Sequence, residues 1–502
     1  MRIPLDHQSD TPLYLQIVEY LREGIVSGRL EPDTRLPASR RLADDLGVSR
    51  ITIENAYAEL EAAGLVRRQM GSGTYVLPPW PLPETFAGNS GDAGRAGEAS
   101  EASEIWPLWQ QDIRARSQSS QGKTPEDLLR AGGHPNPISF AGGSGDPRLF
   151  PVDDLRKTIQ AVMRCDDTTA LGYGEPGGYT PLRRTIASVL ASQGLQAGPD
   201  NILITSGSQQ AMALVSQLLL RPGDAILVES PTYAGALDLF RALGLRMVNV
   251  PVDEEGMQVD RVEQLLQSHH PKLIYTIPNF HNPTGTCLSG QRRRQLVALA
   301  DRYNTPILED DFVGDLRYDG RAQPALKAID PGGRVIYTST FSKMLMPGLR
   351  VGFVVAEGPV GEALAAHKRA VDLATSSLIQ RALEDYVTVG RYQAHLRRSC
   401  RIYGGRRDAM LEAIDKHLPT GARVNPPQGG LFIWLRLPPG LSSNEFLPLA
   451  CEEGTAFAPG RAFAPGGSDC DSYLRLNFAA EPRSEIEEGI RRLARAMVRL
   501  MP

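Results

Sequence analysis

One lysine lies among small hydroxyl residues in a turn between two apolar runs. Residues 335–337 and 351–355 are apolar and predict two strands. Lys343 and, seven residues later, Arg350 lie between them. A neighbouring cation and partial burial both lower the pKa of a lysine and make its amine better at forming a Schiff base. The stretch therefore predicts either a Schiff-base lysine or a loop lysine that makes a surface hydrogen bond.

The elements that would position this lysine belong to a large α/β unit. From about residue 126, apolar strand-like runs alternate with helical stretches, which predicts a mostly parallel sheet with crossover helices. From about residue 390, a helical segment and two further strand-like runs predict a smaller α+β lobe. The runs of the large sheet lie at residues 201–205, 225–228, 246–250, 272–277, 306–309 and 334–338.

Polar side chains follow these strands at their carboxyl ends, where the sites of open α/β sheets lie. Residues 205–210 place hydroxyls and backbone amides at the start of an apolar helix, which is either a phosphate cradle or a capped helix with no ligand. Tyr233 either stacks on a planar ligand or packs in the core. Asn282 lies in a turn rich in amide and imidazole groups. Asp310 belongs to three consecutive acids, which are costly to bury without a cation.

One ligand requires all of these groups together. Pyridoxal phosphate needs a cradle for its phosphate, a plate for its ring, a donor for its phenolate oxygen, a carboxylate for its pyridine nitrogen and an amine for its aldehyde. Tyr233, Asn282, Asp310 and Lys343 match the last four needs, and Arg350 joins the phosphate cradle. Each signal is weak alone, but together they predict a pyridoxal phosphate site.

The first part of the chain, residues 1–77, predicts a separate unit. Helical periodicity and turn residues are typical of a winged helix-turn-helix, with helices over residues 11–27, 40–46 and 50–63 and a hairpin of residues 65–68 and 74–76. Ser39 and Ser49 are expected to cap the second and third helices.

Positive charge in this unit is local. Residues 1–77 contain nine arginines and eleven acids, and the whole chain has a formal net charge of −4. The arginines nevertheless gather on the second helix, the start of the third and the hairpin, at Arg40, Arg41, Arg50, Arg67 and Arg68. Those surfaces would face phosphate and the major groove. A winged helix that binds another protein is the alternative.

Composition sets further limits on the 502 residues, a length that allows two to four domains. The chain has neither an apolar run of membrane-spanning length nor an apolar signal segment at its start. Its five cysteines are scattered, which predicts reduced thiols, a cytoplasmic location and no metal site. Residues 78–125 are rich in Pro, Gly, Ala, Ser and Glu and predict a flexible linker.

Residues 11–77 resemble the GntR-type winged helix-turn-helix. The resemblance is carried by residues 36–50 (LPASRRLADDLGVSR) and 71–74 (GSGT). It implies DNA contacts before the second helix, at the polar start of the recognition helix and on the wing. On this chain those positions are Arg40, Ser49, Arg50, Thr52, Arg67 and Gly71.

Residues 130–502 resemble fold-type I pyridoxal-phosphate enzymes of the aspartate aminotransferase class. The resemblance rests on the order of the strand-end groups and implies a Schiff base on Lys343, with Asp310 on the pyridine nitrogen, Asn282 on the phenolate and Tyr233 on the ring. The residues that it implies for the cofactor phosphate are Ser206, Gly207, Ser208, Gln209, Thr340 and Arg350.

Three further positions follow from the same resemblance. Tyr173 matches a tyrosine that reaches the phosphate of the partner subunit, which implies a homodimer. Arg475 matches the arginine that binds the α-carboxylate of the substrate. Phe312 stands where the family usually has a tyrosine that hydrogen-bonds the phenolate, and this departure argues against efficient transamination.

The combination of domains resembles the MocR subfamily of bacterial transcription regulators. We expect a winged helix over residues 1–77, a linker over 78–125 and an aminotransferase-like domain over 126–502, with a large lobe of about 170–385 and a small lobe of about 390–502 plus 126–165. The resemblance implies a regulator that binds double-stranded operator DNA and senses an amino compound or pyridoxal phosphate through Lys343. Two alternatives remain, a working aminotransferase with an appended DNA-binding domain and a scaffold that binds no cofactor.

Overall fold

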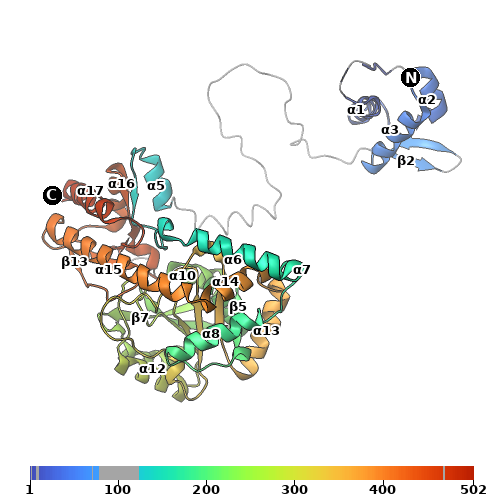
Figure 1. Ribbon diagram of the computed structural model, residues 1–502. Coiled ribbons are helices and arrows are strands. Elements are labelled where there is room, and N and C mark those ends of the chain that lie inside the picture. The colour runs from blue at the N-terminus through green and yellow to red at the C-terminus, as the bar shows by residue number, and fades with distance from the viewer. Residues whose placement is uncertain are drawn as a thin grey trace. The chain divides into compact units, whose positions relative to one another are not determined.

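The chain divides into two units, residues 1–113 and 114–502. The computed structural model describes residues 1, 3–6, 9, 11–69, 72–77, 124–466 and 470–501 (Figure 1). The predicted DNA contact Gly71 and most of the predicted linker, residues 78–125, lie outside the described residues. Only Thr124 and Pro125 of that linker are described, and they begin the first helix of the second unit.

The N-terminal unit is a three-helix winged fold, as the sequence predicts. Its elements are α1 (Leu13–Val26), α2 (Ser39–Leu46), α3 (Arg50–Ala62), β1 (Arg35–Leu36), β2 (Val66–Gln69) and β3 (Gly73–Val76). The strands form an antiparallel sheet in the order β1-β3-β2. Ile17, Leu42, Ile53 and Val76 lie in its buried core.

The two predicted helix caps of this unit have different outcomes. Ser49 caps α3, because its hydroxyl accepts a hydrogen bond of 3.1 Å from the backbone N–H of Thr52. The prediction for Ser39 is wrong: α2 begins at Ser39 itself, and Ala38 occupies the cap position without a side-chain bond. The predicted start of the helix, Arg40, is one residue too late, because a sequence pattern does not resolve the first residue of a helix.

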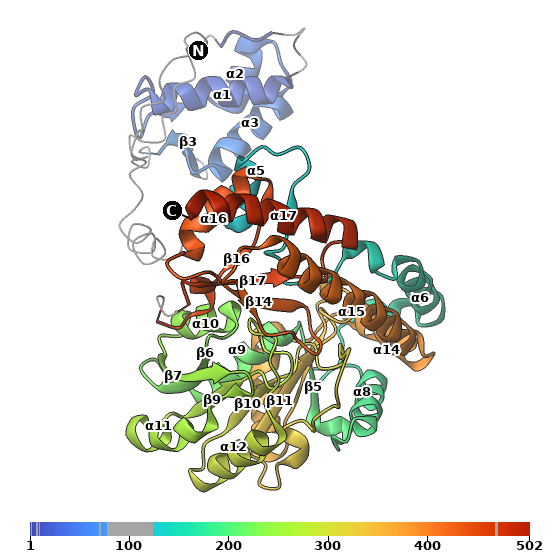
Figure 2. The ribbon, with the colours of Figure 1, turned by 90° about the vertical axis from the view of Figure 1, so that its left-hand side faces the viewer.

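The second unit is built on an eight-stranded, mostly parallel sheet. Its strand order is β5-β12-β11-β10-β9-β6-β7-β8, and Figure 2 labels most of these strands. Antiparallel neighbours occur only at β12 and β8. The strands are β5 (Ile202–Thr205), β6 (Ala225–Ser230), β7 (Arg246–Asp253), β8 (Gly256–Met257), β9 (Leu273–Thr276), β10 (Ile307–Asp310), β11 (Val335–Thr340) and β12 (Gly352–Val355).

Helices bury both faces of this sheet. Adjacent residues of one strand enter different cores: Leu308 packs in one and Ile307 in the other, together with Val262 and Leu296 of α11 and α12. Burial on both faces explains why these strands read as continuous apolar runs. The helices of this lobe are α8 (Thr180–Ser192), α9 (Ser208–Leu219), α10 (Ala234–Ala242), α11 (Val262–His269), α12 (Gly290–Arg302) and α13 (Gly358–Asp372).

The C-terminal part forms a smaller α+β lobe around a four-stranded sheet of order β13-β14-β17-β16. The segment before α6 also joins this lobe, because β4 (Ile138–Ser139) pairs in parallel with β15 (Thr455–Ala456). The other elements are β13 (Arg423–Val424), β14 (Phe432–Arg436), β16 (Ala458–Pro459), β17 (Tyr473–Asn477), α5 (Pro125–Ala131), α6 (Val152–Cys165), α7 (Asp167–Leu171), α14 (Ser377–Thr388), α15 (Arg391–His417), α16 (Ser443–Glu452) and α17 (Arg483–Leu500).

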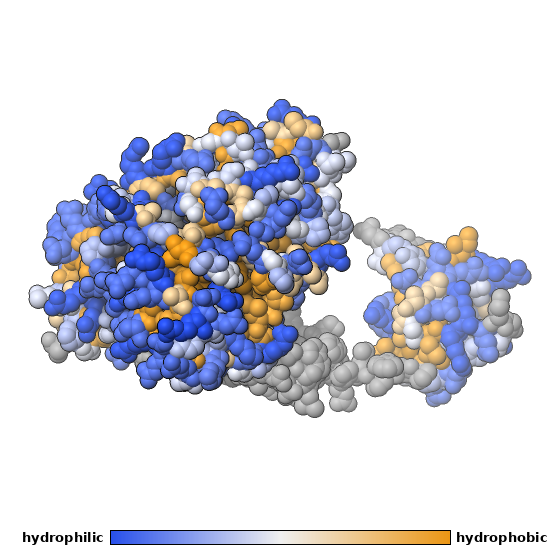
Figure 3. Space-filling model, turned by 90° about the horizontal axis from the view of Figure 1, so that it is seen from below, coloured by the Kyte–Doolittle hydropathy of each residue, from blue (hydrophilic) through white to orange (hydrophobic). Residues whose placement is uncertain are grey.

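The surface of the larger unit is mixed in character. Figure 3 shows one face, on which hydrophilic side chains surround smaller hydrophobic areas. None of the helices in the described part of the chain is both long and apolar enough to cross a bilayer.

Candidate functional site

A cavity of about 450 Å³ lies where the carboxyl ends of β6, β9, β10 and β11 meet the small lobe. These strand ends converge because parallel strands share one carboxyl edge, and the connecting loops extend over it. The cavity collects six of the predicted residues, namely Ser208, Tyr233, Asn282, Asp310, Lys343 and Arg475.

Lys343 follows β11 and presents an amine without a hydrogen bond or ion pair among the described residues. Its loop is fixed by Thr340, whose hydroxyl donates to the Val351 carbonyl over 3.1 Å and accepts from the Ser342 backbone N–H over 3.1 Å. Burial lowers the pKa of Lys343, and the positive charges of Arg475 and Arg350 lower it further. A lower pKa increases the fraction of the amine that is neutral and nucleophilic at a given pH.

Asp310 ends β10 and is almost fully buried. Its Oδ2 accepts a hydrogen bond of 3.0 Å from the hydroxyl of Tyr275, whereas its Oδ1 has no partner among the described residues. Burial raises the pKa of this carboxyl to about 7. A buried carboxylate oxygen without a partner is costly, so the cavity fits a cationic donor such as a protonated pyridine. Sequence reasoning missed Tyr275, since a tyrosine within an apolar strand reads as core.

An anion cradle lies at the start of α9. Gly207 has φ of +89°, and a Cβ there would lie 2.7 Å from Nη2 of Arg350. Arg350 donates to the Ser206 carbonyl (3.0 Å) and to the hydroxyl of Ser342 (3.3 Å). Backbone amides at a helix start together with a guanidinium are suited to a phosphate. Ser342 was not predicted, although its position beside Lys343 could have indicated it.

Two predicted phosphate residues use their side chains within the protein. Gln209 donates from Nε2 to the Gly235 carbonyl over 2.9 Å, and the Thr340 hydroxyl binds Val351 as described above. Both residues lie beside the cradle, but neither lines the cavity. The structure thus places them as supports of the surrounding loops.

Arg475 is a buried cation on β17. Its Nη1 donates to Oδ1 of Asn282 over 2.9 Å, and its Nη2 donates to the Ala141 carbonyl over 2.6 Å. The guanidinium carbon lies 4.1 Å and 4.8 Å from the ring centroids of Phe432 and Phe463. Among the described residues, Arg475 forms no ion pair with an acid and its Nε has no hydrogen-bond partner. Burial lowers the pKa of its guanidinium to about 10. Such an arginine favours an anionic ligand.

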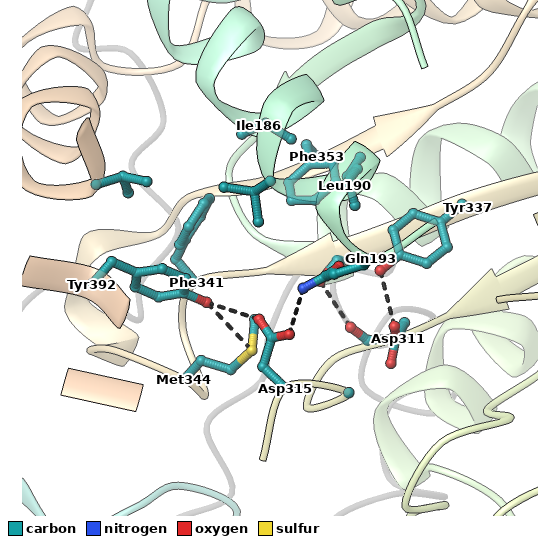
Figure 4. A pocket seen from close by; sticks show the side chains of 14 residues that line it. Ile186, Leu190, Gln193, Asp311, Asp315, Tyr337, Phe341, Met344, Phe353 and Tyr392 are labelled. Atoms are coloured by element: carbon teal, nitrogen blue, oxygen red, sulfur yellow. Dashed lines mark hydrogen bonds between the residues drawn. The ribbon is translucent and has the colours of Figure 1, made fainter. Parts of the chain in front are cut away.

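A second, smaller cavity of about 30 Å³ is lined by Asp311 and Met344, among other residues (Figure 4). These two residues directly follow Asp310 and Lys343 in the sequence. Tyr392 of α15 donates to Oδ2 of Asp315 over 3.3 Å and contacts Sδ of Met344 at 3.5 Å. Burial raises the pKa of Asp315 to about 6. The contacts connect the long helix of the small lobe to the residue that follows Lys343.

Tyr173 does not line the cavity and is 92% exposed. Leu171 and Leu373 are also exposed hydrophobic residues. Their two segments meet, because a Cβ on Gly174 would lie 3.6 Å from the Thr375 carbonyl. An exposed tyrosine among exposed apolar side chains is typical of an interaction surface.

The winged helix presents most of its predicted DNA contacts to solvent. Arg40 is exposed and makes no ion pair among the described residues, whereas Arg50 pairs with Glu54 (2.7 Å) and Arg67 with Asp33 (3.0 Å). Ser49 is also exposed, and Thr52 is half-buried. Sequence reasoning missed Ile51, which is 67% exposed in the first turn of α3, where an apolar group can contact a thymine methyl.

These features fit pyridoxal phosphate. The unpartnered Oδ1 of Asp310, the free amine of Lys343 and the cradle that Gly207 forms beside Arg350 meet the needs of its pyridine nitrogen, aldehyde and phosphate. The cofactor of class I and II aminotransferases is pyridoxal phosphate.

Comparisons with known proteins match both units. Residues 143–493 match the model of aminotransferase class I and II, and residues 13–76 match that of bacterial regulatory proteins of the gntR family. The probable rhizopine catabolism regulatory protein MocR of Rhizobium meliloti is 30% identical over 99% of this chain and 96% of its own. Aromatic-amino-acid aminotransferase 1 of Thermococcus litoralis is 40% identical over 71% of this chain and 87% of its own.

A solved structure resembles the second unit. The kynurenine aminotransferase of Pyrococcus horikoshii, crystallised in complex with PMP, has a TM-score of 0.74 and 36% identity over 78% of this chain and 100% of that chain. The match to MocR covers 99% of this chain, whereas the matches to the two aminotransferases cover 71% and 78% of it. The chain belongs to the aminotransferase class I and II family and carries a GntR-family winged helix, the domain combination of MocR-type regulators.

Proposed function

We propose that this protein is a cytoplasmic transcription regulator that binds operator DNA and senses an amino compound, or pyridoxal phosphate itself, through Lys343. The observation that carries the proposal is the combination of two features in one chain. The winged helix has an exposed Arg40, the cavity has the half-buried amine of Lys343, and neither group has an ion pair in the described part of the chain. The similarity to MocR over almost the full length supports the same reading.

In this proposal four side chains hold the ring of the cofactor. Lys343 supplies the amine, Oδ1 of Asp310 accepts from the pyridine nitrogen, and Tyr233 lies against the ring. Asn282 donates from its amide to the phenolate oxygen, since its Oδ1 is already bound to Arg475. When bound, pyridoxal phosphate supplies an aldehyde that condenses with amines.

The phosphate is assigned to the cradle at the start of α9. Gly207 and Ser208 offer backbone N–H groups, and Ser206 and Ser208 offer hydroxyls, whereas the backbone N–H of Ser206 already donates to Oε1 of Gln210 over 2.7 Å. Gln209 and Thr340 support the loops, and Arg350 supplies the charge. The exposure of Tyr173 supports a homodimer, in which Tyr173 of the partner subunit reaches the phosphate.

The effector is assigned to the opposite end of the cavity. Arg475 binds a carboxylate of the amino compound, because this guanidinium is buried and forms no ion pair with an acid in the described part of the chain. A ligand changes DNA binding only through different affinities for two states of the protein. The contact of Tyr392 with Met344 offers a route from the cavity to the small lobe.

DNA is assigned to the exposed face of α2, α3 and the wing. Arg40 is free to bind phosphate, Ser49, Arg50 and Thr52 lie at the start of the recognition helix, and Arg67 lies on the wing. Ion pairs of Arg50 and Arg67 at the surface are weak enough to exchange for DNA phosphates.

The test is a binding titration with the intergenic DNA upstream of the protein's own gene. We expect an affinity for this DNA well above that for random DNA of the same length, and a change of this affinity when pyridoxal phosphate or an amino compound is added. Equal affinity for both DNAs, with and without cofactor, would refute the regulator.

A working aminotransferase is the second candidate, favoured by the cavity that contains Lys343, Asp310 and Arg475 together. Phe312 opposes it, because its buried ring packs against Phe432 (6.5 Å between centroids) where a hydroxyl donor would tune the cofactor. Sustained multiple turnover with an amino acid and a keto acid would favour the enzyme. A single stoichiometric conversion would favour the sensor.

A further inference from the structure

A carboxylate lies in the wall of the cofactor cavity without a partner. Glu126 of α5 lines the cavity, is partly buried, and makes no hydrogen bond or ion pair among the described residues. The N-terminal cap of α5 does not use it. Thr124 and Asp127 form that cap reciprocally, with the Asp127 backbone N–H donating to the Thr124 hydroxyl over 3.2 Å.

The position of Glu126 is fixed by the packing of α5. Leu129, one turn later, is buried, and the helix packs against α16. Gly132 at the end of the helix approaches the Cys451 backbone so closely that a Cβ would lie 2.7 Å from its carbonyl oxygen. The carboxylate thus lies on a packed helix and keeps its place in the cavity wall.

The cavity has opposite charges on two parts of its wall. Arg475 is cationic and Glu126 is anionic, and the two interact electrostatically. Other parts of the wall are apolar and are formed by Phe312, Ala458, Pro459, Ala462 and Phe463. A ligand with an anionic end, an apolar stem and a cationic end is complementary to this arrangement, whereas a dicarboxylate would place an anion beside Glu126.

We propose that Glu126 selects the effector by binding a distal cationic group, so that the regulator favours α-amino acids whose side chain ends in an ammonium or guanidinium group. The inference rests on the proposed function, in which Arg475 binds the α-carboxylate and Lys343 marks the amino end. α5 is also the first described helix after the winged helix in the sequence. A ligand that contacts Glu126 therefore acts on the part of the second unit that is nearest in sequence to the DNA-binding unit.

The experiment compares three ligands of similar length with different side-chain ends. Calorimetric titrations of the cofactor-loaded, full-length protein use L-lysine, L-norleucine and L-2-aminoadipate. We expect lysine to bind roughly tenfold or more tighter than norleucine, as one charge-assisted contact provides, and aminoadipate to bind weakest. Glu126→Gln should weaken lysine roughly tenfold and leave norleucine within about twofold. Glu126→Arg should reverse the preference toward aminoadipate, which a merely damaged helix cannot do.

Asp127→Asn is the matched control, because Asp127 is the neighbouring acid of α5 and does not line the cavity. It should keep the preference for lysine. The assignment of Glu126 is wrong if the three ligands bind the wild-type protein with equal affinity. It is also wrong if Glu126→Gln and Glu126→Arg keep the wild-type order of the three affinities. Either result leaves the proposed sensing function intact. If none of the three binds any form of the loaded protein, this inference fails, whereas the regulator itself fails only if the cofactor and amino compounds also leave the affinity for the upstream DNA unchanged.

Discussion

Asp310→Asn should have opposite effects on the cofactor-free and the cofactor-bound protein. Burial raises the pKa of Asp310 from 3.8 to about 7, which means that the folded chain holds this proton more tightly than the unfolded chain. Stability is therefore lost as the pH rises from about 4 to about 7, by on the order of 4 kcal/mol for this group. The asparagine variant does not titrate and should keep that part of its stability at higher pH.

In the cofactor-bound protein the same substitution should be unfavourable. Oδ1 of Asp310 has no partner in the described part of the chain and is available to a protonated pyridine nitrogen. A charged hydrogen bond of this kind is worth about 1.5–3 kcal/mol, so Asp310→Asn should weaken the affinity for pyridoxal phosphate roughly tenfold to a hundredfold. Urea unfolding of cofactor-free protein on both sides of the pH window, and cofactor titration by visible absorption, measure the two effects.

Glu309→Gln is the control. Glu309 is equally buried and its pKa is also raised to about 7, but its oxygens accept from the backbone N–H groups of Leu326 and Lys327 (2.8 and 2.9 Å), and it does not line the cavity. It should change the pH dependence of stability and leave cofactor affinity unchanged. The reasoning would be refuted if Asp310→Asn left cofactor affinity intact, or if it removed none of the loss of stability between pH 4 and 7.

Three further outcomes follow from the geometry. Gly207→Ala should lower cofactor affinity at least about tenfold in an absorption titration, because its φ is positive and the new Cβ would displace Arg350; normal affinity would contradict the cradle. Phe312→Tyr should lower the pH midpoint of the cofactor's visible spectral change by about one unit, since it adds a donor beside Asn282; an unmoved midpoint would show that the ring lies elsewhere. Arg40→Ala should weaken binding to all DNA sequences alike and reduce the salt slope by about 1 in a fluorescence titration; a loss confined to one sequence would indicate base readout.

The sequence predicts most of the fold and much of the site because strand ends are local signals. Apolar runs buried on both faces followed at once by polar residues locate Tyr233, Asn282, Asp310 and Lys343 without any long-range information. Their meeting in one cavity then follows from the parallel sheet. The helices and wing of the N-terminal unit were also predictable from local signals, namely helical periodicity and turn residues, apart from the first residue of α2.

What could not be predicted depends on distant contacts. Arg475 donates to the carbonyl of Ala141, 334 positions away, and no pattern in either segment indicates that pairing. Glu126 stands at the border of a segment with linker composition, and only the packing of α5 on α16 brings it to the cavity. Tyr275 looks like a core residue because its ring is buried in the core. The role of its hydroxyl becomes apparent only from the hydrogen bond to Asp310.

The most direct test of a cofactor-dependent regulator measures cofactor occupancy and DNA affinity in the same titration. Wild-type protein and Lys343→Ala are titrated with pyridoxal phosphate in the presence of the upstream DNA. We predict that the DNA affinity of the wild type changes in step with covalent occupancy of Lys343, and that the variant, at equal protein stability, shows no such change. A DNA affinity that is the same in both proteins at every cofactor concentration would contradict the account.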